Sequence, residues 1–160
     1  RDEPSSYEAR AEIMWAGSLS HNGLTGCGTD GGDWACHKLE HELSGLFDVS
    51  HGAGLAAIWG SWARYVYRSD AARFARFAHK VMGVSGAGTH EEMAEKGIAA
   101  MENFFRAIHM PVSLAQLGIH PTEQQMREMA EKCSLAVGGK AGVIRPLAVE
   151  DMVEIYRMAL

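Results

Sequence analysis

The sequence predicts an all-α fold, an irregular multi-helix domain that covers residues 1–160. Three observations predict it. Apolar residues recur at helical spacing, capping-box patterns mark several helix starts, and glycine-rich or proline-containing segments separate the periodic runs. No stretch alternates as a half-buried strand does, and Val143-Ile144 is too short to build a sheet. We therefore expect about eight helices of uneven length rather than a simple up-and-down bundle.

Helices in the first half of the chain are bounded by small polar residues and glycines. The expected N-terminal caps are Ser5 (in a capping box with Glu8), Asp33 and Ser69. Asn22-Gly23 ends the first helix, since both residues tolerate the left-handed conformation of a helix stop. These signals predict helices over residues 5–20, 33–46, 51–67 and 69–77. The third of them should be largely buried, because it carries Leu55, Ile58, Trp59, Trp62, Tyr65 and Val66.

In the second half, Thr89-x-x-Glu92 and Thr122-x-x-Gln125 are two further capping boxes. Pro111 prevents extension of the helix that begins at the first of them. The expected helices run over residues 89–108, 113–117, 122–137 and 149–160. The apolar residues expected to face the core at the end of the first are Met101, Phe104, Phe105 and Ile108.

Composition excludes several classes of protein. A hydrophobic content of 47% excludes a disordered chain, and a net charge of −5 without a basic cluster makes nucleic acid an unexpected partner. No apolar run is long enough to cross a membrane. The three cysteines form no CxxC pair, so we expect neither a disulfide framework nor a thiolate zinc site, and a reducing, cytoplasmic location.

A group of three histidines lies between positions 37 and 51. His37 and His41 are one helical turn apart and therefore point the same way, a spacing that can present two imidazoles to one metal ion. His51 follows a helix break at residues 47–50, and a tight turn could fold it back over the same face. Histidines at this spacing are also common as a surface pair. A non-catalytic helical interaction domain with incidental histidines therefore remains an alternative.

A second alternative is a zinc hydrolase. His37-x-x-Glu40-His41 matches the H-x-x-E-H pattern, in which both histidines bind zinc and the glutamate is the general base. Five residues are a weak signal, and the α+β architecture of that class needs strands that this sequence does not predict.

The spacing His37-x3-His41-x9-His51-Gly52 resembles the signature of the iron-containing (group III) alcohol dehydrogenases, in the butanol-dehydrogenase-like branch. The resemblance covers essentially the whole chain. The other segments that carry it are Asn22-Gly23-Leu24-Thr25-Gly26, Asp33-Trp34-Ala35, Glu40-His41-Glu42-Leu43-Ser44, His51-Gly52-Ala53-Gly54-Leu55-Ala56, Phe104-Phe105 before Met110-Pro111, and Pro146-Leu147 before Glu150-Asp151.

This resemblance implies the dehydroquinate synthase-like C-terminal helical domain of such an enzyme. In that family one aspartate and three histidines hold a divalent metal, Fe²⁺ in many members and Zn²⁺ in some. Two of those histidines match His37 and His51. His41 matches a histidine beside the nicotinamide, so it is the expected catalytic and cofactor-binding residue. The family's aspartate and first histidine lie in a segment that this chain does not contain.

The implied reaction is hydride transfer between a primary alcohol or aldehyde and NAD(P)H, with NADP(H) favoured and the metal polarising the substrate oxygen. The chain starts at Arg1 without an initiating Met, so we expect a fragment or a processed chain that lacks the N-terminal nucleotide-binding domain. Alone, it should have little or no dehydrogenase activity. The expected partners are the substrate and that domain, which would dock on an exposed apolar patch, and a homodimer is possible.

Overall fold

The computed structural model describes residues 2–29 and 31–160, and Arg1 and Asp30 lie outside the described residues. The chain divides into two compact units, Arg1–Gly32 and Asp33–Leu160. The described residues form α-helices and 3₁₀ turns without a named strand, so the all-α prediction is confirmed. Among the described residues, an isolated antiparallel β-bridge pairs Ala141 with Leu147. No helix among these residues has the length and apolar character that crossing a membrane requires.

The first unit consists of α1 (Tyr7–His21) and a 3₁₀ turn, η1 (Leu24–Gly26). Its N-cap is Ser6, whose hydroxyl accepts a hydrogen bond from the Ala9 amide, so the predicted cap at Ser5 is wrong by one residue. Gly23 follows the helix with a φ of 84°, which supports the predicted stop.

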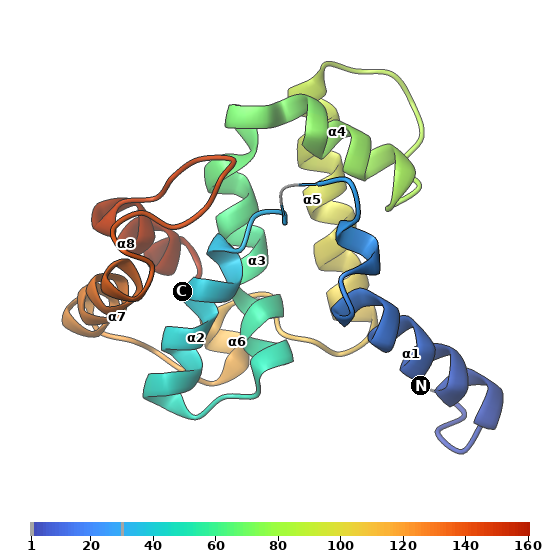
Figure 1. Cartoon of the computed structure of the whole chain (residues 1–160), viewed down its shortest axis with the longest axis horizontal. Coiled ribbons are helices and arrows are strands. Elements are labelled where there is room, and N and C mark those ends of the chain that lie inside the picture. Colours follow the sequence, from blue (N-terminus) through green and yellow to red (C-terminus); the bar gives the residue numbers. More distant parts are fainter. Residues whose placement is uncertain (1, 30) are drawn as a thin grey trace. The chain divides into compact units, whose positions relative to one another are not determined.

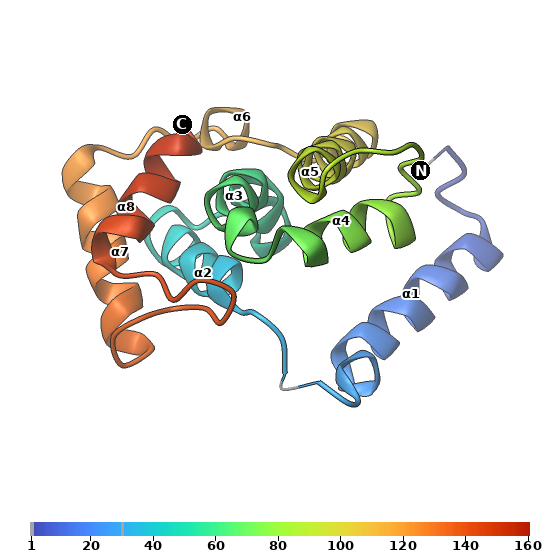
Figure 2. The same cartoon turned by 90° about the horizontal axis from the view of Figure 1, so that it is seen from above.

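The second unit contains the remaining helices. They are α2 (Ala35–Phe47), α3 (His51–Val66), the 3₁₀ turn η2 (Tyr67–Asp70), α4 (Ala71–Lys80), α5 (His90–Ala107), α6 (Leu114–Leu117), α7 (Glu123–Ala136) and α8 (Val149–Met158). Helix α3 lies in the middle of this unit and packs against α2, α5, α6 and α8 (Figures 1 and 2). Its central position explains its apolar sequence, and Ala57, Ile58 and Ala63 on it are fully buried.

Local caps explain most helix starts in this unit. The predicted capping boxes at Thr89 and Thr122 are both present. Helix α4 is capped by Asp70, which accepts from the Arg73 amide at 3.1 Å, rather than by the predicted Ser69. The chain forms a 3₁₀ turn over residues 67–70, so Ser69 is still inside a helical turn where the cap was expected.

Hydrogen bonds to the Asp33 carboxylate connect the start of α2 to a loop that is distant in the sequence. Its Oδ1 accepts from the Ala35 amide at 2.8 Å, and its Oδ2 accepts from the amides of Val143 and Ile144 at 2.8 and 2.9 Å. The N-cap position of α2 is Trp34, so the predicted cap at Asp33 is wrong by one residue, although the Asp33 carboxylate still accepts from the first amide of the helix and also holds the segment before α8. The second role depends on residues 110 positions away.

The end of α5 differs from the sequence expectation. Phe104 and Ile108 are 49% and 43% exposed, so the prediction that they face the core is wrong in this chain. Phe105 is partly buried and packs edge-on against Trp59, with ring centroids 6.1 Å apart. The last turns of α5 therefore border a surface groove rather than the core.

Cysteine burial predicts thiol reactivity. Cys27 is exposed, whereas Cys36 and Cys133 are buried. Burial raises the pKa of Cys133 to about 11 and that of Cys36 still further. Because the thiolate is the reactive form, a chromogenic disulfide reagent should label Cys27 rapidly in the folded chain and all three thiols in denaturant. A Cys27→Ser variant should lose the fast phase, and a fast phase that persists would contradict this assignment.

Candidate metal centre

The three histidines come together because of the short break between α2 and α3. Helix α2 ends at Phe47, and Asp48 adopts a left-handed conformation with a φ of 53°. Helix α3 then starts at His51, after the predicted interruption. The break places the first residue of α3 beside the face of α2 that carries His37 and His41.

Among the three histidines, the two rings that lie closest together are those of His37 and His51. Nε2 of His37 lies 3.2 Å from Nε2 of His51, and the two ring centroids are 4.9 Å apart. Two nitrogens bound to one ion at about 2.0–2.1 Å and a tetrahedral angle are separated by roughly 3.3 Å. The pair therefore fits two ligands of one divalent metal. The His41 centroid lies 6.0 Å from that of His37 and 5.5 Å from that of His51.

Glu40, which the sequence suggested only as the general base of a zinc hydrolase, is a fourth member of the cluster. Its side chain is fully buried beneath the exposed His51, and its Oε2 is paired with His51 Nδ1. The Ser44 hydroxyl donates to its Oε1. A signal was present in the sequence, because Glu40 lies on the α2 face that also buries Leu39 and Leu43. A carboxylate on an apolar helix face needs a polar partner.

This burial argues against the zinc-hydrolase alternative. A general base must reach a water molecule or the substrate, but Glu40 has no exposed surface and both of its oxygens have partners. The described residues also lack the strands of that architecture. The assignment of Glu40 as a general base is therefore wrong.

A groove of about 440 Å³ adjoins the histidines. His37 of α2 lies at its edge, Leu55, Trp59 and Trp62 of α3 line it, and Phe105 borders it from α5. Trp62 is only 7% exposed, and its indole Nε1 has no hydrogen-bond acceptor among the described residues. The groove is lined mainly by apolar and aromatic side chains, with Asp33 and His37 as its charged or polar residues.

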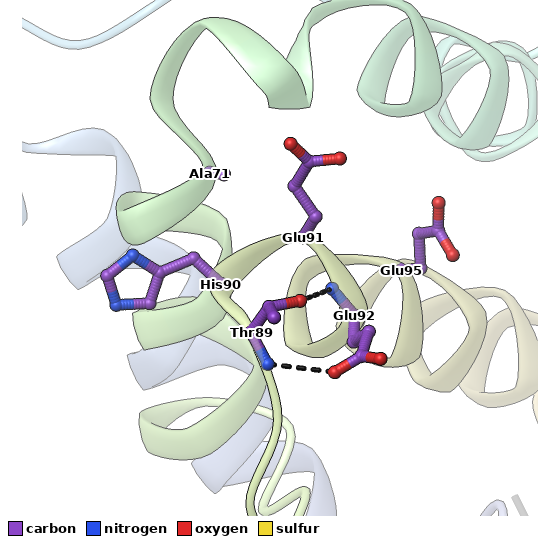
Figure 3. Close-up of a pocket in the computed structure, with 6 residues that line it drawn as sticks. All are labelled: Ala71, Thr89, His90, Glu91, Glu92 and Glu95. Carbon is purple, nitrogen blue, oxygen red and sulfur yellow. Dashed lines mark hydrogen bonds between the residues drawn. The ribbon is translucent and has the colours of Figure 1, made fainter.

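A second hollow, of about 630 Å³, lies at the start of α5 (Figure 3). Its carboxylates already have structural roles. Glu92 completes the capping box with Thr89, and these hydrogen bonds lower the pKa of Glu92. Glu95 accepts from the Tyr67 hydroxyl at 2.6 Å, and Glu91 pairs with Arg68. This hollow is therefore a capped helix start and not a candidate centre.

Comparison with known proteins places the whole chain in one family. The sequence model described as "Fe-containing alcohol dehydrogenase family, C-terminal" matches residues 1–160. NADH-dependent butanol dehydrogenase A of Clostridium acetobutylicum is 34% identical over 157 residues, which are 98% of this chain and 40% of that protein. The NADPH-dependent aldehyde reductase YqhD of Escherichia coli is 32% identical over 117 residues, 73% of this chain and 30% of that protein.

Solved structures agree with the fold. NADH-dependent butanol dehydrogenase A from Thermotoga maritima superposes with a TM-score of 0.88 at 41% identity, over 98% of this chain and 40% of that one. The substrate- and cofactor-free form of YqhD from E. coli gives 0.88 at 27% identity, over 99% and 41%. The chain thus spans about 40% of the length of its first relatives. It belongs to the Fe-containing alcohol dehydrogenase family and corresponds to its C-terminal helical domain.

Proposed function

We propose that residues 1–160 supply His37 and His51 as two ligands of a divalent-metal site in an NAD(P)-dependent alcohol dehydrogenase or aldehyde reductase. The observation that carries the proposal is the 3.2 Å separation of their Nε2 atoms. Two imidazoles make an incomplete set, since zinc sites usually have at least three protein ligands. The remaining ligands would come from polypeptide outside these residues.

Each histidine has a distinct role in this proposal. His37 and His51 hold Fe²⁺ or Zn²⁺, which when bound would polarise the oxygen of a primary alcohol or aldehyde. His41 is exposed on the same face, and its ring is farther from His37 than the His51 ring is. His41 is therefore not one of the two proposed metal ligands. Its imidazole is available to orient a nicotinamide or to relay the alcohol proton.

We propose the groove beside His37 as the surface on which the rest of the enzyme docks. The relatives are more than twice as long as this chain, and a segment that completes the metal site must approach His37. Such a segment would cover Trp59 and Phe105 and could offer an acceptor to the Trp62 indole. The names of the relatives include both NADH- and NADPH-dependent enzymes, and our prediction remains NADP(H).

Metal binding and catalysis by the purified chain test this proposal together. Anaerobic equilibrium dialysis should show weak binding of one Fe²⁺ or Zn²⁺ ion, because two ligands are present. Reduction of butanal with NADPH or NADH should be absent, because His41 is the one residue of this chain expected to contact the nicotinamide and a single side chain does not hold a nucleotide. A folded chain that binds no divalent ion would overturn the ligand assignment. Nicotinamide-dependent butanal reduction would overturn the prediction that the chain alone is inactive.

A further inference from the structure

A fully buried carboxylate beneath a candidate metal ligand needs an explanation. Glu40 has no exposed surface, whereas the side chain of its partner His51 is 48% exposed. Burying a carboxylate is costly unless hydrogen bonds compensate it. The compensation here comes from His51 Nδ1 on one oxygen and from the Ser44 hydroxyl on the other.

We infer that Glu40 is a positioning residue, which holds His51 in the tautomer and orientation that direct its Nε2 toward His37. This inference rests on the proposed metal site. A carboxylate that accepts from Nδ1–H leaves the lone pair of a neutral imidazole on Nε2. That nitrogen is the one that lies 3.2 Å from His37 Nε2. A carboxylate behind a ligating histidine also makes the imidazole more basic and hence a stronger ligand.

The backbone makes room for this carboxylate at one position. Gly54 lies one helical turn after His51 on α3, and a Cβ there would be 2.9 Å from Cγ of Glu40. Contacts below 3.0 Å require something to move, so any larger residue at position 54 would displace Glu40. A side chain at position 54 would therefore compete for the space that the Glu40 carboxylate occupies beside His51.

Ser44 connects the same carboxylate to the break before His51. Its hydroxyl lies near Glu40 Oε1 and 3.2 Å from the carbonyl oxygen of Val49. One hydroxyl proton serves one of these acceptors at a time. The network thus spans α2, the break and the first residue of α3, which are the parts that must keep their positions for the two Nε2 atoms to meet.

Direct coordination is the competing role for this residue. Ligand atoms of Glu40, His41 and His51 all lie within 4.8 Å of one another, so these three residues could in principle surround an ion. Glu40 would then have to release His51 Nδ1. The two roles differ in one respect that can be measured: a positioning residue acts through His51, and a ligand acts without it.

The first test uses ¹⁵N NMR of the metal-free chain at about pH 8.5, where imidazole is neutral. His51 should be in the Nδ1–H tautomer. Glu40→Leu should shift it toward Nε2–H, and Glu40→Gln, which keeps an acceptor oxygen, should have a smaller effect. Glu42→Gln, on the same helix, is the matched control and should change nothing. A wild-type Nε2–H tautomer, or no change in Glu40→Leu, would overturn the inference whether or not metal binds.

The second test is a double-mutant cycle on Zn²⁺ affinity. Glu40→Leu should weaken Zn²⁺ binding by roughly 10–100-fold, the usual range for removal of a group behind a ligand. In a His51→Ala background, the same change should have almost no further effect. A full effect that persists without His51 would identify Glu40 as a direct ligand instead. Gly54→Ala should reproduce the tautomer change, whereas Gly45→Ala, which has open space around it, should not.

Discussion

Replacing His37 with alanine is expected to weaken divalent-metal binding strongly, whereas replacing His41 is expected to leave it intact. His37 contributes one of the two nitrogens that lie 3.2 Å apart, and without it a single imidazole remains. The loss of Zn²⁺ affinity should exceed about 100-fold, the upper range for groups that act behind a ligand. Calorimetric Zn²⁺ titration, with elemental analysis after dialysis, measures both variants.

His41→Ala is the matched control for this prediction, because it removes an imidazole from the same helix face one turn away. Circular dichroism should show that both variants retain their helices. Loss of metal in the His41 variant would contradict the assignment. It would favour the alternative set of Glu40, His41 and His51.

The second large expected effect is on the stability of the folded chain. Gly97→Ala should lower the free energy of unfolding by about 1–3 kcal/mol, the usual cost of overpacking. Gly97 lies where α5 crosses α4, and a Cβ there would be 2.6 Å from the Cβ and 2.9 Å from the Cα of Ala78. A backbone atom cannot move aside as the end of a flexible side chain can, so the two helices would have to separate.

Urea denaturation and calorimetry would measure this loss, and each kcal/mol should lower Tm by roughly 2–4 °C in a chain of this size. Gly45→Ala, on α2 with nothing within 4 Å of the added Cβ, is the comparison. There alanine should stabilise the helix by about 0.5–1 kcal/mol. A Gly97 variant as stable as the Gly45 variant would show that α4 and α5 do not pack as closely as described.

Much of the fold could be predicted because its signals are local. The boxes at Thr89 and Thr122 need only residues three positions apart, and both are present. The helix break before His51 was predicted for the same reason. Errors of one residue at Ser5 and Ser69 occurred where a neighbouring Ser6 or Asp70 made the capping bond instead.

The faces of helices were harder to predict than their ends. Phe104 and Ile108 have the spacing of a buried face, yet both are exposed, and Ile108 lines the groove. Periodicity shows that a helix has an apolar face, but not whether the described chain supplies the partner that covers it.

By itself the sequence determined that the fold is all-α and that His37 and His41 share a helix face, because both follow from the helical repeat. The resemblance to a family, which the comparisons confirm, supplied the prediction that His37 and His51 act together. Only the tertiary structure brought Nε2 of His51 within 3.2 Å of Nε2 of His37 and placed Glu40 behind it. These contacts join α2 to α3 across a left-handed turn, and their geometry depends on how the helices pack rather than on spacing along the chain.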